Sequence, residues 1–153
     1  MVSAKQFGTV QWYIQSGLDE GAQLLVGGLG HPEGLGGYYV KPTIFTGVKP
    51  GMTIEREEIF GPLLAVMEYQ DLEQAIEMAN DTIYGLSGYV SGTDPELLEY
   101  VAGAMLAGRV LVNTVVNREK KSPFGGFKQS GIGRTSWFYG IEEYLEPKVI
   151  TRF

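Results

Sequence analysis

The sequence of 153 residues contains no cysteine. Disulfide bonds, thiolate metal sites and a cysteine nucleophile supplied by this chain are therefore all excluded. Histidine occurs only once, as His31 in the glycine-rich run GLGHPEGLGG. Because a neutral imidazole needs partners to act as a base or a metal ligand, we interpret His31 as a solvated loop residue. Any chemistry that the chain supports must use other side chains.

Long hydrophobic runs are also missing. No apolar segment approaches the ~20 residues that a bilayer-spanning helix requires, and the N-terminal MVSAKQFGTV has no apolar signal core. We therefore expect a soluble, cytoplasmic protein without a membrane partner. The net charge of −6 argues against nucleic acid as a partner. The 44% of hydrophobic residues is too high for a disordered tail, so we expect a folded domain.

Helical patterns recur along the chain. Ser3 followed by Gln6 fits a capping box, and apolar residues then recur at helical spacing up to position 18. Asp71 is the predicted N-cap of a second helix. Asp94 before a proline starts a third, with Gly108 placed for its C-terminal cap. A short further helix is predicted near 136–144.

Strand-like segments lie between these helices. Pro42 predicts that the strand around it is irregular or at a sheet edge. Strands that alternate with helices indicate the α/β class, with a layered, largely parallel sheet and flanking helices. No linker or repeat divides the chain, which predicts one domain or one part of a domain. The predicted strands cover 23–26, 38–45, 63–69, 86–91, 109–116 and 148–153.

The run SPFGGFKQSGIGR at 122–134 holds four glycines and two cations but no acidic residue. Free backbone N–H groups and cations both favour phosphate, so an anion site is one interpretation. The spacing matches neither the dinucleotide fingerprint nor the P-loop. Phe124 and Phe127 bracket the first glycine pair, which favours a packed tight turn, and both interpretations stay open on composition alone. Five of the chain's twelve cations fall in this region: Arg118, Lys120, Lys121, Lys128 and Arg134.

A second run, EEIFGP at 57–62, precedes a predicted strand. A carboxylate pair in that position is usually a solvated face. Adjacent carboxylates could also divide acid and base roles, but successive strand residues point to opposite faces, which weakens that reading.

Taken together, these runs resemble the C-terminal portion of the NAD(P)-dependent aldehyde dehydrogenase family. The motifs follow the family's order over essentially the whole chain, which corresponds to about the last third of a full-length member. Residues 1–147 would then be part of the catalytic domain, and 148–153 the C-terminal oligomerisation strand. The matching motifs are EEIFGP at 57–62, NDTIYGLSGYV at 80–90, GRVLVN at 108–113, SPFGGFKQSGIGR at 122–134 and LEPKVIT at 145–151.

The resemblance assigns roles to individual residues. Glu58 corresponds to the glutamate that accepts hydrogen bonds from the nicotinamide ribose of NAD or NADP, and Phe60 to the aromatic ring beside the nicotinamide. Phe124 corresponds to a wall of the aldehyde channel. Arg134 and Glu146 correspond to a pair in a network near the dimer interface, and we expect them to form an ion pair here. The alternative is a surface arginine and a solvated glutamate, since exposed ion pairs contribute little.

Other parts of the family's site are missing. Its nucleophilic cysteine, its general-base glutamate and its cofactor domain all lie upstream of the region that this chain resembles. Thr135 stands where the family commonly has a glutamate after SGxGR. The resemblance therefore implies weak or no cofactor binding by this chain alone, no catalytic residue and no metal site within it.

Three functions follow as hypotheses. The first is a fragment of an aldehyde dehydrogenase that is inactive alone. The second is a module that associates with itself or with an N-terminal aldehyde dehydrogenase chain. The third is a small-molecule or anion binder that uses the cations of 118–134. The strand over 148–153 follows Pro147 and predicts a homodimer or larger assembly, since unpaired strand edges favour association.

Overall fold

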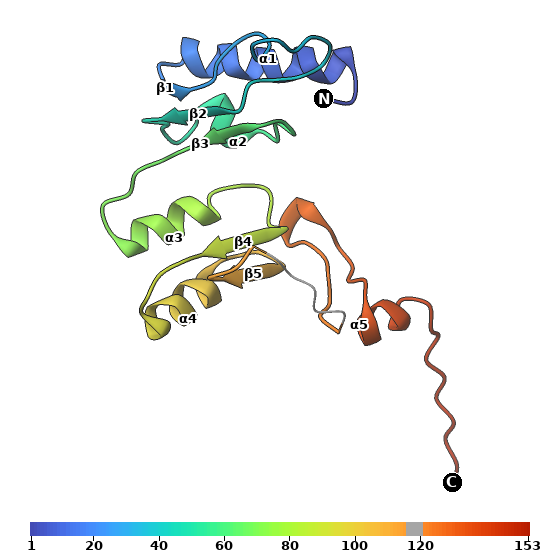
Figure 1. Cartoon of the computed structure of the whole chain (residues 1–153). Coiled ribbons are helices and arrows are strands. Elements are labelled where there is room, and N and C mark those ends of the chain that lie inside the picture. Colours follow the sequence, from blue (N-terminus) through green and yellow to red (C-terminus); the bar gives the residue numbers. More distant parts are fainter. Residues whose placement is uncertain (116–120) are drawn as a thin grey trace. The chain divides into compact units, whose positions relative to one another are not determined.

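The computed structural model describes residues 1–115 and 121–153, which form two compact units, Met1–Gln70 and Asp71–Phe153 (Figure 1). The cations Arg118 and Lys120, and the last residue of the strand predicted over 109–116, lie outside the described residues.

The first unit packs two helices and a three-stranded sheet. The strand order is β1-β2-β3, with β1 antiparallel and β3 parallel to β2. In chain order the elements are α1 (Ala4–Asp19), β1 (Gln23–Val26), β2 (Thr43–Thr46), α2 (Thr53–Arg56) and β3 (Leu63–Ala65).

The core of this unit lies between α1 and the sheet. Val10 and Ile14, one turn apart on α1, are fully buried, as is Phe45 of β2. Fully burying such side chains stabilises the fold by roughly 1.5–3 kcal/mol each. The Ser3 hydroxyl caps α1 by accepting from the Gln6 N–H at 3.2 Å, as predicted. The Gln6 side chain does not reach back to Ser3 and instead donates to the chain near residue 60.

The second unit is built on two parallel strands. Strand β4 pairs with β5 from Ser87↔Arg109 to Val90↔Val112, and α4 packs on both strands. Asp71 and Asp94 cap α3 and α4 as predicted. In chain order the elements are α3 (Leu72–Asn80), β4 (Ser87–Val90), α4 (Pro95–Ala104), β5 (Arg109–Val112), the 3-10 helix η1 (Lys128–Ser130) and α5 (Trp137–Glu142).

The α/β class is confirmed, but several boundaries differ from the predictions. Strand β2 begins at Thr43, directly after Pro42, and is the central strand of its sheet. A central position is possible because Pro42, which has no N–H to donate, lies outside the strand. Helix α4 ends at Ala104 with Met105 as C-cap, so Gly108 is not its cap. Residues 148–153 form no strand, because no described strand pairs with them. The helix predicted near 136–144 is present as α5.

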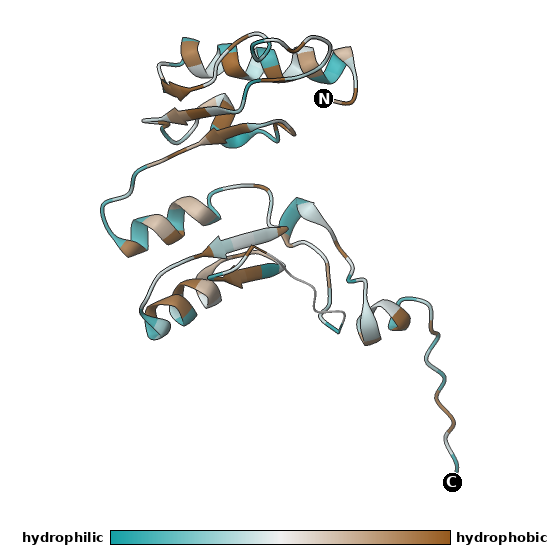
Figure 2. Ribbon diagram, in the orientation of Figure 1, coloured by the Kyte–Doolittle hydropathy of each residue, from teal (hydrophilic) through white to brown (hydrophobic). Residues whose placement is uncertain are grey.

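Both units expose apolar surface. All four residues of β1 are exposed, with Leu25 at 66%, and the hydrophobic colouring of this strand in Figure 2 is therefore at the surface. The tail from Leu145 to Phe153 is exposed along its length. Among the described helices, none combines the length and the apolar character needed to cross a bilayer.

Candidate functional site

The EEIFGP run forms an exposed turn in the first unit. Helix α2 ends at Arg56, Glu57 is its C-cap, and β3 begins at Leu63. Glu58 is exposed, and no hydrogen bond or ion pair joins it to another described residue. The ring of Phe60 is 75% exposed, and its backbone has φ +49°, a left-handed conformation that residues other than glycine adopt infrequently. The turn thus presents a carboxylate and an aromatic ring to solvent.

These two side chains suit the nicotinamide half of a dinucleotide. An ionised carboxylate can accept from both hydroxyls of a ribose, and neither oxygen of Glu58 is taken by the described protein. An uncovered aromatic face suits a flat heterocycle. The residues present therefore fit the cofactor that the sequence resemblance implies.

Phe124 lies in the second unit, in a short antiparallel bridge with Thr135. The Phe124 N–H donates to Thr135 O at 2.9 Å, and the Thr135 N–H donates back at 2.8 Å. The Thr135 hydroxyl also donates to Phe124 O at 3.3 Å. Thr135 therefore holds the backbone of Phe124 and cannot supply a carboxylate at this position.

The ring of Phe124 is covered on one side by a cation. The guanidinium carbon of Arg109 lies 5.3 Å from the ring centroid, and Arg109 Nη2 donates to the Ser87 hydroxyl at 3.3 Å. The Nε of Arg109 is buried, with no hydrogen-bond partner within residues 1–115 and 121–153. Such cation–π contacts contribute about 0.5–2 kcal/mol. Arg109, the first residue of β5, thus contacts both Ser87, the first residue of β4, and the Phe124 ring.

The glycines of SPFGGFKQSGIGR let backbone segments approach closely. A Cβ on Gly108, just before β5, would overlap the carbonyl oxygen of Gly125. The Gly85 carbonyl accepts from the N–H groups of Gly108 (2.9 Å) and Phe127 (2.8 Å). The run is therefore a packed turn, as the two phenylalanines that bracket its first glycine pair indicated.

The cations in this run are occupied by carbonyl oxygens. Lys128 Nζ donates to Asn80 O and Thr82 O at the end of α3, at 2.6 and 3.0 Å. Arg134 Nη1 donates to Gly126 O and Gly133 O, at 3.0 and 2.9 Å, and its guanidinium lies 5.4 Å from the centroid of the Phe127 ring. These contacts occupy both N–H groups of Arg134 Nη1 and two of the three of Lys128 Nζ, which weakens the anion-binder hypothesis.

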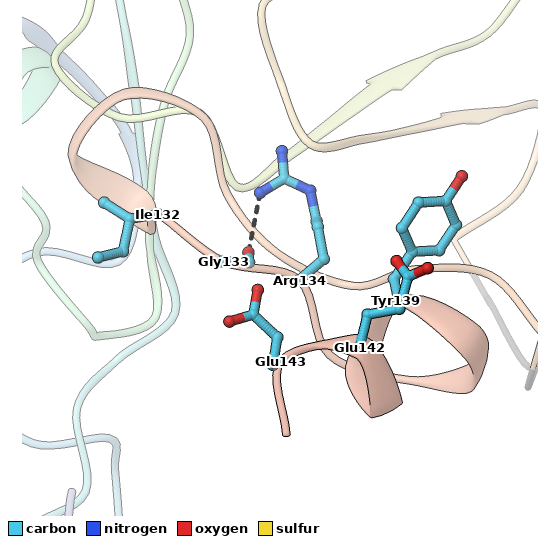
Figure 3. A pocket seen from close by; sticks show the side chains of 6 residues that line it. All are labelled: Ile132, Gly133, Arg134, Tyr139, Glu142 and Glu143. Atoms are coloured by element: carbon cyan, nitrogen blue, oxygen red, sulfur yellow. Dashed lines mark hydrogen bonds between the residues drawn. The ribbon is translucent and has the colours of Figure 1, made fainter. Parts of the chain in front are cut away.

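Arg134 also lines a pocket of about 690 Å³ beside α5 (Figure 3). Glu142 and Glu143 line the same pocket, so its charge disfavours an anion, and the guanidinium is directed toward Gly133 O. Among the described residues Arg134 forms no ion pair with Glu146, which lies exposed in the tail. Nearby backbone carbonyls take the guanidinium instead, and the pairing of Arg134 with Glu146 near a subunit interface stays a prediction.

A second pocket, of about 390 Å³, brings Phe124 and Arg134 together in the second unit. Glu58 and Phe60 lie together in the first unit. No cluster of three or more potential metal-ligating side chains occurs within residues 1–115 and 121–153.

Sequence reasoning missed three residues that contact the candidate site residues or their turn. Gln6 and Tyr13 of α1 contact the EEIFGP turn, and Arg109 contacts Phe124. The spacing of Gln6, Val10 and Tyr13 predicts that they share one helical face, but it does not predict which part of the chain that face contacts. His31 is exposed, as interpreted, and its ring also stacks on Phe7 at 4.7 Å.

Comparison with known proteins extends this picture. The model of the aldehyde dehydrogenase family matches residues 1–150. A Staphylococcus haemolyticus protein named as an aldehyde dehydrogenase is 54% identical over the whole chain, which covers 32% of that protein. The chain thus spans about a third of the length of the curated relatives that it matches.

Solved structures agree. A variant of aldehyde dehydrogenase C from Pseudomonas syringae, solved with NAD+ and octanal, is 44% identical over 95% of this chain and 30% of its own, with a TM-score of 0.91. A Mycobacterium tuberculosis aldehyde dehydrogenase, solved with NAD+, is 43% identical over 94% of this chain and 30% of its own, with a TM-score of 0.90. The chain belongs to the aldehyde dehydrogenase family.

Proposed function

We propose that this chain provides the C-terminal third of an NAD(P)-dependent aldehyde dehydrogenase and is inactive alone. The observation that carries the proposal is the exposed turn on which Glu58, free of protein partners among the described residues, lies two residues from the uncovered ring of Phe60. In this role Glu58 accepts from the nicotinamide ribose and Phe60 packs beside the nicotinamide. The bound cofactor supplies the hydride acceptor for oxidation of an aldehyde to an acid.

Substrate contact is proposed for Phe124. Its backbone is held by Thr135 and its ring by Arg109, so the ring is a preorganised apolar wall that orients an aldehyde and excludes water. The chain contains no cysteine, so it does not supply the thiolate that forms the family's covalent adduct with the carbonyl carbon.

A second candidate function is a module that associates with a partner chain or with itself. The chain exposes 11,062 Å². Two separate compact units of these lengths would expose only about 9,200 Å² in total. The difference exceeds the roughly 800 Å² that each partner buries in a standard interface. This surface supports association with an N-terminal aldehyde dehydrogenase chain or with a second copy.

The test is an aldehyde-dependent assay for NADH or NADPH on the purified chain. We expect no product, since no thiolate is available. Activity that survives repurification and disappears in Glu58→Ala would overturn the proposal. We also expect NAD and NADP to bind with dissociation constants weaker than about 10 µM, some −7 kcal/mol, and calorimetry measures this.

Co-expression with the upstream two-thirds of the Staphylococcus haemolyticus relative separates the two candidates. Co-purification with activity, lost in Glu58→Ala, favours a partner-completing module. Failure of the two chains to co-purify argues against that module and leaves the inactive fragment.

A further inference from the structure

Helix α1 presents one face to the turn that carries Glu58 and Phe60. Gln6, Val10 and Tyr13 follow at spacings of four and three residues, which places them on one side of a helix. All three contact the turn over 57–61, although 44 to 54 residues separate the hydrogen-bonded partners in sequence. The turn is therefore held from outside its own segment.

Gln6 holds the strained part of the turn. Its Nε2 donates to the carbonyls of Ile59 and Phe60, each at 3.2 Å. Phe60 has φ +49°, a conformation that persists in a residue other than glycine only when the surroundings impose it. The two carbonyls flank that backbone, so the Gln6 amide supports the conformation that leaves the Phe60 ring exposed.

Val10 and Tyr13 fix the two ends of the turn. Gly61 lies directly on the fully buried Val10, and a Cβ on Gly61 would lie 2.6 Å from a Val10 methyl carbon. The hydroxyl of Tyr13, itself only 8% exposed, donates to Glu57 Oε2 at 2.8 Å. Glu57 is thereby turned toward the helix, while its neighbour Glu58 keeps no partner in the described part of the chain.

We propose that Gln6, Val10 and Tyr13 are positioning residues for the nicotinamide-ribose site: they hold the turn 57–61 in the conformation that presents Glu58 and Phe60. This inference rests on the proposed function and deepens it. It also divides the carboxylate pair by role, since Glu57 anchors the turn and Glu58 faces the ligand. Neither Gln6 nor Tyr13 needs to touch the nucleotide for this effect.

The experiment is an NMR titration of the whole chain with nicotinamide mononucleotide, which carries only the half of the cofactor that this turn would bind. Tyr13→Phe removes only the hydroxyl, and Gln6→Glu keeps the side-chain shape but replaces the donor with an acceptor facing two carbonyls. Tyr13→Phe is expected to weaken binding about fivefold, the effect of one hydrogen bond, and Gln6→Glu by more, because it loses two. Gln15→Ala is the matched control and should bind normally, because the Gln15 side chain lies on the same helix and donates to Asp19 rather than to the turn.

A double-mutant cycle separates positioning from general destabilisation. If Tyr13 acts through Glu57, then Tyr13→Phe combined with Glu57→Ala binds no more weakly than either single variant. Circular dichroism and amide spectra confirm that each variant is folded, with changes confined to the turn.

The outcomes distinguish the two claims. The positioning role is overturned if the single variants bind nucleotide like the wild type. It is also overturned if the losses of binding free energy in Tyr13→Phe and Glu57→Ala add up in the double variant. Either result leaves the proposed function intact. If the NMR signals of the turn in the wild-type chain do not shift at up to about 10 mM nucleotide, the binding free energy is weaker than about −3 kcal/mol. That result overturns both the cofactor site and the positioning role.

Discussion

At the scale of single residues, the family's glycine-rich motif is explained by packing. Gly85, Gly108 and Gly125 bring three backbone segments within contact, and hydrogen bonds to the Gly85 carbonyl join them. Side chains at these positions would separate the segments. The position of Phe124 depends on this contact, because Phe124 immediately precedes Gly125.

Gly108→Ala is therefore expected to destabilise the chain by about 3 kcal/mol, the upper range for overpacking, because the new methyl group meets a backbone carbonyl. Urea unfolding followed by circular dichroism measures the change. Gly103→Ala in α4 is the control, since its Cβ would meet nothing within 4 Å, and it should stabilise by about 0.5–1 kcal/mol. Equal effects of the two substitutions would contradict the packing explanation.

At the scale of elements, helices α3 and α4 are joined by side chains. Tyr100 of α4 donates its hydroxyl proton to Glu73 of α3 at 3.0 Å. Asn80 at the end of α3 also donates to Ala104 O and accepts from the Leu106 N–H. The second unit thus holds its helices together through polar contacts, whereas the first relies on a buried apolar core.

The Tyr100 contact predicts a pH dependence. The hydrogen bond to Glu73, then the negative charge of Glu73 and then desolvation raise the pKa of Tyr100 above its ordinary value of 10.0. A raised pKa means that the contact stabilises the folded chain below pH 10 and that this contribution disappears as the pH rises through the raised pKa. Glu73→Gln should lower the pKa of Tyr100 toward 10.0.

NMR titration of the tyrosine ring carbons measures the pKa of Tyr100 in the wild type and in Glu73→Gln. The Tyr100→Phe variant assigns the signal. An unchanged titration in Glu73→Gln would show that the carboxylate is not the cause.

At the scale of the whole molecule, the chain has a third of a family member's length and a large exposed apolar surface. The tail over 148–153 is extended, exposed and apolar at Val149, Ile150 and Phe153. Unpaired extended segments of this kind associate with strand edges. We propose that the tail pairs with a neighbouring subunit in a homodimer or larger assembly.

Deletion of residues 148–153 is therefore expected to lower the molecular mass measured by light scattering, while the helical signal of the chain remains. Both proteins are compared at the same concentration, about 50 µM, because mass action controls assembly. A wild-type chain that is monomeric there, or an assembly that survives the deletion, would rule out this role for the tail.

Features that depend on residues close together in the chain could be predicted from the sequence. Ser3, Asp71 and Asp94 mark three helix starts because a capping side chain bonds N–H groups two or three residues away. The motifs in series predicted the family, and the absence of cysteine excluded a cysteine nucleophile supplied by this chain.

Features that depend on contacts between residues distant in sequence followed only from the tertiary structure. It turned the cations Lys128 and Arg134 toward backbone carbonyls instead of a phosphate or Glu146, and it placed α1 against the EEIFGP turn. It left 148–153 unpaired, because a strand exists only where another strand supplies its hydrogen bonds. Spacing along the chain predicts which face a side chain occupies, whereas packing decides what that face meets.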